Sequence, residues 1–154
     1  MTWTPPTLPV SCGALIHDEA GRLLVVKPSY KKGWTIPGGA MEADGESPWD
    51  ACRREVFEET ALVVRTGRLV AVDTRPAKPG AQLGIRLLFD CGTVTADQIE
   101  RIELQADELT TFRFLPLDAA LDKLRPAIAR RVAAAAAADR CVYLEDGTRL
   151  PAVD

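Results

Sequence analysis

The sequence predicts an α/β protein in which a mixed β-sheet lies between helices. Three observations support this class. Short apolar segments that alternate with polar residues recur along the chain, as strands require. Residues 48–60 combine an apolar stripe with an acidic face, which is typical of a helix that packs on one side. Residues 126–140 are rich in alanine and favour a further helix.

The chain begins with a predicted hairpin and a glycine turn. Residues 10–17 and 22–27 have the composition of two strands joined by a turn. Gly38 and Gly39 then form a turn that lets the backbone approach a ligand closely. An acidic loop follows, which ends at the next helix.

The helix at residues 48–60 has clear start signals. Ser47 is a good N-cap, and Pro48 suits the first helical position. Trp49, Cys52 and Val56 make an apolar stripe on one face. We therefore expect this helix to pack through that stripe and to present its glutamates elsewhere.

The second half of the chain continues the pattern. In the strand at 83–94, Arg86 is expected to point toward a ligand, because its face is the less apolar one. Residues 117–124 predict a helix that breaks before Pro126. The other expected strands, including a closing hairpin, are residues 62–67, 68–76, 110–117 and 141–150.

Length, composition and net charge limit the domain organisation and the classes of function that the chain can have. With 154 residues, 47% of them apolar, the chain is expected to be a single domain over residues 1–154. A net charge of -3 gives no basic footprint for duplex nucleic acid. The absence of an apolar run of about 18 residues or of a signal-like start predicts a cytoplasmic protein without a membrane contact. The oligomeric state stays open, a homodimer included.

Three glutamates dominate the acidic helix. Glu55, Glu58 and Glu59 are spaced i, i+3 and i+4, so they share one helix face and repel one another. A hard divalent cation would offset this repulsion, because Mg²⁺ prefers oxygen ligands. The alternative is a solvated surface face, which is common for glutamate-rich helices.

The surrounding residues resemble the signature of the Nudix family, Gly-x5-Glu-x7-Arg-Glu-apolar-x-Glu-Glu-x-Gly-apolar. Gly39 opens the motif, Glu46 follows, and seven residues later comes the segment from Arg54 to Leu62. Two departures occur. One extra residue separates Gly39 from Glu46, and Ala61 replaces the last glycine, at a position where a helix would end in a left-handed residue.

The resemblance implies a Nudix-type α/β/α sandwich and a magnesium site, with Mn²⁺ as a substitute. The metal ligands would be Glu55, Glu58 and Glu59 with the Gly39 carbonyl, and Arg54 would orient the carboxylates. Glu46 would have a similar orienting role. The catalytic set implied in this way is Glu58, Glu59, Arg54 and Glu108.

Glu108 is the one member of that set that lies outside the motif from Gly39 to Leu62. In many Nudix proteins a glutamate six residues before an aromatic completes the metal site or acts as base, and here Glu108 precedes Phe114 by six. The alternative is that Asp107 and Glu108 cap or solvate a turn. Both readings stay open.

Substrate contacts are less well defined by the sequence. Lys27 could meet phosphates, and Tyr30 and Phe89 offer aromatic surfaces for a base, in addition to Arg86. Solvent exposure of the lysines and core packing of the aromatics are the alternatives.

The leading function is a Mg²⁺-dependent pyrophosphohydrolase that cleaves a nucleoside diphosphate linked to another group, such as a nucleoside triphosphate, ADP-ribose or a dinucleotide polyphosphate. A small-molecule nucleotide is thus the expected partner. The alternatives are a non-catalytic Nudix-fold module for nucleotide binding or regulation and, last, an enzyme of this fold with different chemistry, such as an isomerase.

Overall fold

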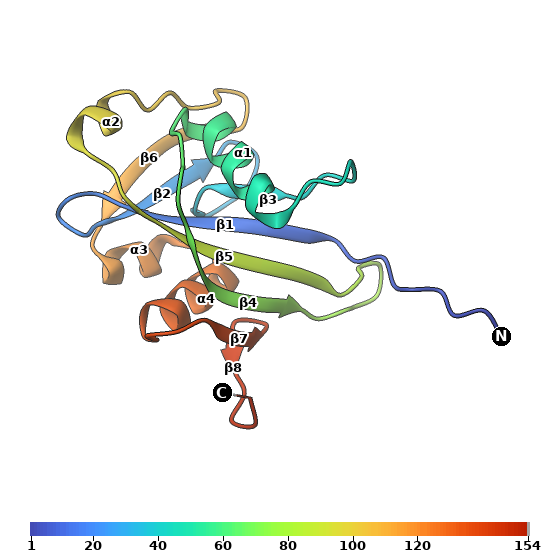
Figure 1. Ribbon diagram of the computed structural model, residues 1–154. Coiled ribbons are helices and arrows are strands. Elements are labelled where there is room, and N and C mark those ends of the chain that lie inside the picture. Colours follow the sequence, from blue (N-terminus) through green and yellow to red (C-terminus); the bar gives the residue numbers. More distant parts are fainter. Residues whose placement is uncertain (154) are drawn as a thin grey trace.

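A mixed β-sheet with helices on both faces forms the structure, a computed structural model that describes residues 1–153 (Figure 1). This confirms the predicted α/β class. The strands are β1 Val10–His17, β2 Leu23–Pro28, β3 Gly38–Ala40, β4 Arg68–Arg75, β5 Gly84–Thr93, β6 Leu109–Leu115, β7 Val142–Glu145 and β8 Thr148–Arg149. The helices are α1 Pro48–Thr60, α2 Ala96–Glu100, α3 Leu117–Lys123 and α4 Pro126–Ala136.

The strand order is β6-β2-β1-β5-β4-β7-β8, with β3 paired to β1. β1 runs parallel to β5, and β4 runs parallel to β7, whereas the other pairs are antiparallel. β1 meets β2 beside their turn, at His17 and Leu23, and meets β3 at its other end, where Cys12 lies opposite Gly39. β1 and β2 therefore diverge, and the glycine turn enters between them.

Two apolar cores lie on the two faces of the sheet. One contains Leu88 and Leu144 with Val132 of α4, and the other contains Leu24 and Ile16 with Val56 of α1. Figure 1 shows α1 and α2 on one side of the sheet and α3 and α4 on the other. No described helix has the length and apolar character needed to cross a bilayer.

The turn between β1 and β2 is organised by Asp18, whose side chain is 5% exposed. Its carboxylate accepts hydrogen bonds from the Ala20 and Arg22 amides at 3.0 and 2.9 Å and from Arg22 Nε at 2.7 Å. Burial acts to raise the pKa of the Asp18 carboxyl, but the bonds from Arg22 and Ala20 outweigh it and hold the pKa below its usual value.

α1 begins and ends as the sequence indicates. Ser47 Oγ accepts a hydrogen bond from the Asp50 amide at 3.1 Å, and Pro48 occupies the first turn. At the other end Ala61 is left-handed, with φ 62°, and its amide donates to the Phe57 carbonyl at 2.8 Å. The left-handed cap expected for this family motif is therefore present, although its residue is alanine.

Several sequence-based boundaries were wrong. Residues 62–67 form no strand. Leu62 and Val64 are buried and Val63 is exposed, which gives a strand-like alternation, but they pack beneath α1, where Arg53 Nε donates to the Val64 carbonyl at 3.1 Å. The short elements β3 and α2 were not predicted, and α4 ends at Ala136 rather than near residue 140.

The two faces of β5 also differ from expectation. The face of Arg86 was expected to be the less apolar one, yet Leu88 on that face is 1% exposed and belongs to the core beneath α4. Phe89 packs in the opposite core. Both faces of β5 are covered because helices lie on both sides of the sheet. The face that carries Arg86 is polar only near the start of the strand, where Arg86 lies.

Candidate functional site

The glycine turn places the backbone of β3 directly against β1 and α1. Gly38 has φ 146°, and a side chain there would overlap the Cys12 carbonyl. A side chain at Gly39 would overlap the carboxylate of Glu55. The absence of side chains thus lets the turn pass between a strand and the acidic face of α1.

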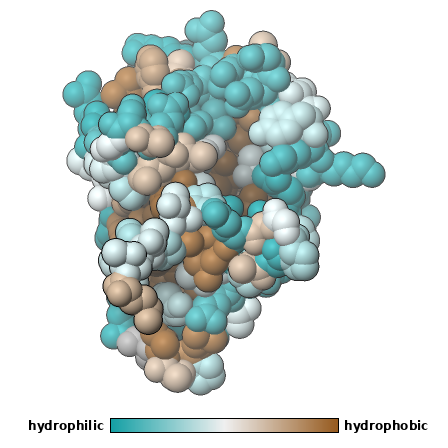
Figure 2. Space-filling view, turned by 90° about the vertical axis from the view of Figure 1, so that its right-hand side faces the viewer, coloured by the Kyte–Doolittle hydropathy of each residue, from teal (hydrophilic) through white to brown (hydrophobic). Residues whose placement is uncertain are grey.

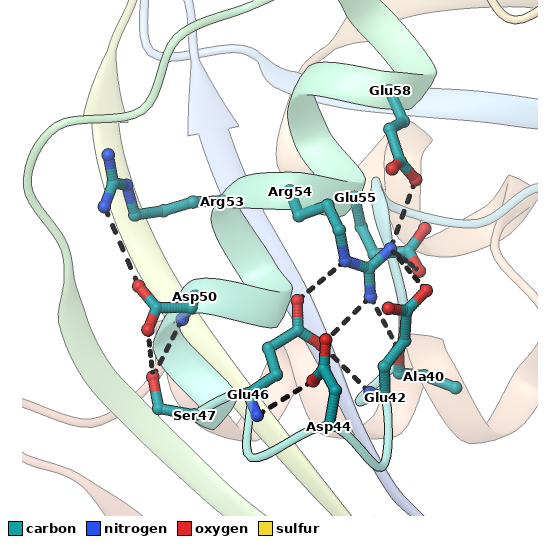
Figure 3. Close-up of polar contacts among 10 residues, drawn as sticks. All are labelled: Ala40, Glu42, Asp44, Glu46, Ser47, Asp50, Arg53, Arg54, Glu55 and Glu58. Atoms are coloured by element: carbon teal, nitrogen blue, oxygen red, sulfur yellow. Dashed lines mark hydrogen bonds and ion pairs between the residues drawn. The ribbon is translucent and has the colours of Figure 1, made fainter.

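Arg54 organises the acidic residues around this turn (Figure 3). Its guanidinium forms a two-pronged contact with Glu46, with Nε to Oε1 at 2.7 Å and Nη2 to Oε2 at 3.1 Å. Nη1 donates to Glu55 at 2.9 Å and to Glu58 at 3.1 Å, and Nη2 also donates to the Ala40 carbonyl at 3.0 Å. One arginine therefore fixes three carboxylates and the end of β3.

The loop with the extra residue holds Glu46 in place. The Asp44 carboxylate accepts from the Glu46 amide at 3.0 Å, and Gly45 is left-handed with φ 90°. The Glu42 amide donates to Glu46 Oε2 at 2.9 Å. The hydrogen bonds from Arg54 and Glu42 lower the pKa of the Glu46 carboxyl, which keeps it ionised opposite Arg54. The loop that contains the extra residue therefore still places Glu46 against Arg54 of α1.

Glu59 is the most buried carboxylate of the group, at 6% exposed. It accepts a hydrogen bond from the Gly38 amide at 3.0 Å. Burial raises the pKa of Glu59 to about 8 against the effect of this bond, and repulsion from Glu55, Glu108 and Glu58 adds to the rise. The helix face thus holds a carboxyl that is costly to ionise without a cation nearby.

Glu55 and Glu108 complete the acidic cluster. Burial raises the pKa of the Glu55 carboxyl, and although Arg54 opposes this, repulsion from Glu58 and Glu108 adds to it. Glu108 comes from the segment before β6, where its carbonyl accepts from the Ser29 amide at 2.8 Å. The structure therefore brings Glu108 close enough to Glu55 and Glu59 for their charges to interact.

The donor set suits a hard cation in its chemistry. Four glutamate side chains and the Gly39 carbonyl, beside which the Glu55 carboxylate lies, would supply oxygen ligands of the kind that Mg²⁺ and Mn²⁺ prefer. Within residues 1–153, however, no group of three His, Cys, Asp or Glu side chains is arranged to hold a metal ion. Glu55 and Glu58 turn toward Arg54, and Glu59 turns toward Gly38, so these bonds would have to give way to a cation.

A pocket of about 420 Å³ lies beside this cluster, a size in the range of small-molecule sites. Glu59, Gly39, Tyr30 and Arg86 are among the residues that line it. Figure 2 views the molecule from the right-hand side of Figure 1 and shows a recessed surface with apolar residues inside and hydrophilic residues around it. Two of the four residues proposed to bind substrate, Tyr30 and Arg86, thus line the same pocket as Glu59.

The other two do not line it. Phe89 packs against Trp49 in the core below α1, with ring centroids 5.1 Å apart. Lys27 is exposed on β2 opposite Thr111 of β6. These positions agree with the structural alternatives for both residues, so neither offers its side chain to this pocket.

Sequence reasoning missed three arginines of the pocket, Arg75, Arg125 and Arg131. Arg75 ends β4, Arg125 directly precedes α4, and Arg131 lies within it. Their only sequence signal is that two of them flank a proline at an element boundary, in "TRP" and "LRP", which does not indicate a shared site.

The sheet between helices and the acidic helix beneath a glycine turn define an α/β/α sandwich with a carboxylate-rich site beside its pocket. The chain belongs to the NUDIX family, because residues 7–135 match the NUDIX domain. A solved structure of similar fold is that of the MutT protein from Methanosarcina mazei Go1, with a TM-score of 0.64 and 27% identity over 76% of this chain and 84% of that one.

Two curated relatives match shorter segments. A MutT-like protein of Streptomyces ambofaciens is 38% identical over 69 residues, 45% of this chain and 44% of that protein. Human diphosphoinositol polyphosphate phosphohydrolase 3-alpha is 44% identical over 56 residues, 36% of this chain and 32% of that protein. The matched segments thus span less than half the length of these two relatives.

Proposed function

We propose that the protein is a Mg²⁺-dependent pyrophosphohydrolase that cleaves a phosphoanhydride bond in a nucleoside diphosphate linked to another group. The observation that carries the proposal is the convergence of Glu55, Glu58, Glu59 and Glu108 beside a pocket and a glycine turn. Mutually repelling carboxylates raise the free energy of the empty site, and a divalent cation would relieve that repulsion and would also offset the negative charge of a substrate diphosphate.

In this proposal Glu55, Glu58 and Glu59 hold the cation with the Gly39 carbonyl. A bound Mg²⁺ would supply neutralisation of the phosphate charge and activation of water. Arg54 keeps Glu46, Glu55 and Glu58 in fixed orientations through the bonds described above. Glu108 approaches from a different element, and we assign its carboxylate to accepting the proton of the attacking water.

The substrate class rests on chemistry and on relatives. MutT-like proteins and a diphosphoinositol polyphosphate phosphohydrolase are among the relatives, and the latter name denotes action on a diphosphate that is not a nucleotide. A panel for testing should therefore include nucleoside triphosphates, ADP-ribose, dinucleotide polyphosphates, nucleotide sugars and a diphosphoinositol polyphosphate.

The deciding experiment incubates the purified protein with Mg²⁺ and this panel and resolves the products by mass spectrometry. Cleavage of one class that is abolished by chelator and by Glu59→Gln supports the proposal, because the substitution removes a ligand charge and little volume. Glu19→Gln is the matched control, since Glu19 is an exposed residue of the β1–β2 turn outside the pocket. An intact fold without cleavage of any compound would reject it.

A second candidate is a non-catalytic module that binds or senses a nucleotide. The observation in its favour is that no three acidic side chains in the described chain are already arranged around an ion position. Calorimetric titration with a nucleotide, in the presence and in the absence of Mg²⁺, distinguishes the binding module from the enzyme. Nucleotide binding that is unchanged by Mg²⁺ and by Glu58→Gln, with no product formed, would establish the module instead of the enzyme.

A further inference from the structure

Besides Glu59, the lining of the pocket contains a strongly basic group of residues. Arg75, Arg86, Arg125 and Arg131 line it. They come from the end of β4, the start of β5, the residue before α4 and α4 itself, so the fold gathers them from segments far apart in sequence. We call these four residues the arginine cluster.

Three members of the arginine cluster lack a carboxylate partner in the part of the chain that the structure describes. Arg75, Arg86 and Arg125 form no ion pair among residues 1–153, in contrast to Arg131, whose Nε lies 2.8 Å from Asp73. Asp73 is fully buried and also accepts from the Gly147 amide at 3.0 Å. One buried carboxylate thus faces several guanidinium groups.

The arrangement of strands concentrates this charge. Arg86 lies directly opposite Asp73 in the β4–β5 ladder, and Arg75 lies opposite Gly84. Because residues two apart on a strand share a face, Arg75 lies on the same face as Asp73. Arg86 Nη1 reaches over Gly84, where an added side-chain carbon would lie 3.1 Å from it. Gly84 therefore leaves room for the guanidinium at the pocket wall.

The pKa of Arg86 agrees with an excess of positive charge in this part of the pocket. Burial lowers the pKa of Arg86, and the charges of Arg131 and Arg75 lower it further, with Asp73 opposing them. Repulsion of the half-buried Arg86 by its neighbouring cations costs free energy in the folded protein unless an anion compensates it.

A second, independent feature is found at Arg125 and the start of α4. The Nε–H of Arg125 is buried and has no hydrogen-bond partner among residues 1–153, a state that is rare in folded proteins. α4 starts without a side-chain cap and without an acidic residue in its first turn, and its first-turn residues Ala127 and Ile128 line the same pocket. The positive end of an 11-residue helix is thus also directed toward this wall.

We propose that the arginine cluster binds a phosphate group that the substrate carries at the end remote from the scissile anhydride. This rests on the proposed function for the position of the anhydride at the glutamates. The preferred substrate is then a diphosphate compound with an additional phosphate ester on its non-reacting part. The planar guanidinium groups suit this role, because they donate paired hydrogen bonds to phosphate oxygens.

The first test needs no turnover. Inorganic phosphate is titrated into the protein with chelator present, so that the glutamates repel the anion and only the basic wall attracts it. We expect saturable binding that weakens as salt rises and at least about tenfold weaker binding in Arg86→Ala and in Arg125→Gln. Arg65→Ala is the matched control, an exposed loop arginine outside the pocket that should bind phosphate like the wild type.

The second test compares kcat/KM for paired substrates that differ by one phosphate ester, such as ADP-ribose and its 2′-phosphate or a nucleoside triphosphate and its 3′-phosphorylated form. We expect a preference of at least about tenfold for the phosphorylated member, which Arg125→Gln removes and Arg65→Ala retains. Equal losses for both members in Arg125→Gln would show contact with the scissile diphosphate and overturn the proposal.

The two tests separate the possible failures. If no compound is cleaved but phosphate binding depends on Arg86 and Arg125, the hydrolase is rejected and the anion site stands. If cleavage occurs but metal-free phosphate binding is absent or is equal in all variants, the hydrolase stands and the anion site is overturned. Circular dichroism of each variant verifies that the fold is intact, and Gly84→Ala, which displaces Arg86 without removing charge, should weaken phosphate binding in the same direction.

Discussion

The carboxylate of Glu55 occupies the space that a side chain at Gly39 would fill. One residue comes from the turn before the acidic loop and the other from the middle of α1, 16 positions later. Their contact ties the glycine turn to the acidic helix, and it explains physically why a glycine is required at the first position of the motif.

Replacing Gly39 with alanine should therefore impair the site rather than the fold. The added carbon displaces the Glu55 carboxylate, so the Mg²⁺ concentration for half-maximal activity should rise by at least about tenfold. Activity measured across a Mg²⁺ series tests this. Gly45→Ala is the control, because its added carbon meets nothing within 4 Å although its φ of 90° is strained. A loss of stability without a change in Mg²⁺ dependence would contradict the prediction.

Arg54→Lys should separate charge from geometry. Lysine keeps the positive charge but lacks the planar fork that contacts Glu46 through two nitrogens while reaching Glu55 and Glu58. We expect turnover to fall by about 10- to 100-fold with weaker Mg²⁺ binding. Arg53→Lys, one residue earlier, should leave both quantities unchanged, because Arg53 contacts Asp50 at 3.8 Å and the Val64 carbonyl at 3.1 Å and neither of these groups belongs to the acidic cluster. Equal effects of the two substitutions would contradict an orienting role for Arg54.

Ala61→Gly should stabilise the protein. Ala61 is left-handed, a conformation that costs a non-glycine residue roughly 1–2 kcal/mol, and part of that gain is offset by the greater freedom of glycine in the unfolded chain. A net gain of about 0.5–1 kcal/mol would raise Tm by roughly 1–4 °C. Ala133→Gly inside α4 should shift Tm in the opposite direction. A lower Tm for Ala61→Gly would refute the left-handed cap.

Asp18 should make stability depend on pH in the acid range. Its pKa is lower in the folded protein than in the unfolded chain, so its contribution is fully present above the unfolded value near 3.9. The contribution is lost as pH falls through the folded pKa, because both states then bind the proton. Urea unfolding of wild type and Asp18→Asn between about pH 7 and pH 2 should show a difference in free energy that narrows below about pH 4. A constant difference would contradict this.

The acidic half of the site could be predicted from the sequence because it is local. Glu46, Arg54, Glu55, Glu58 and Glu59 lie within 14 residues on one loop and one helix, so helical geometry alone places the three glutamates of the helix on one face. The cap by Ser47 and the left-handed end at Ala61 follow from equally local rules.

The basic half could not be predicted in this way. Arg75 and Arg125 are 50 residues apart, and their meeting depends on how α4 packs on β4, which no local pattern encodes. Phe89 shows that a residue that the sequence suggests for binding can instead belong to the core. An aromatic residue on a strand has the same sequence signal whether it faces a ligand or a core, and here Trp49 of α1 covers it. The prediction of a strand at residues 62–67 was wrong because a loop can also alternate buried and exposed apolar residues, as Leu62, Val63 and Val64 do.

The C-terminal hairpin has a consequence for solubility. β7 pairs with β4 in parallel and lies beyond residue 135, where the match to the NUDIX domain ends. A protein cut before residue 141 would leave the long strand β4 with a row of open amide and carbonyl groups, a template on which another copy could add. In this structure β7 covers Ala71 to Thr74 of that edge, and the sheet then ends in β8, a strand of two residues, which offers a short template for another copy.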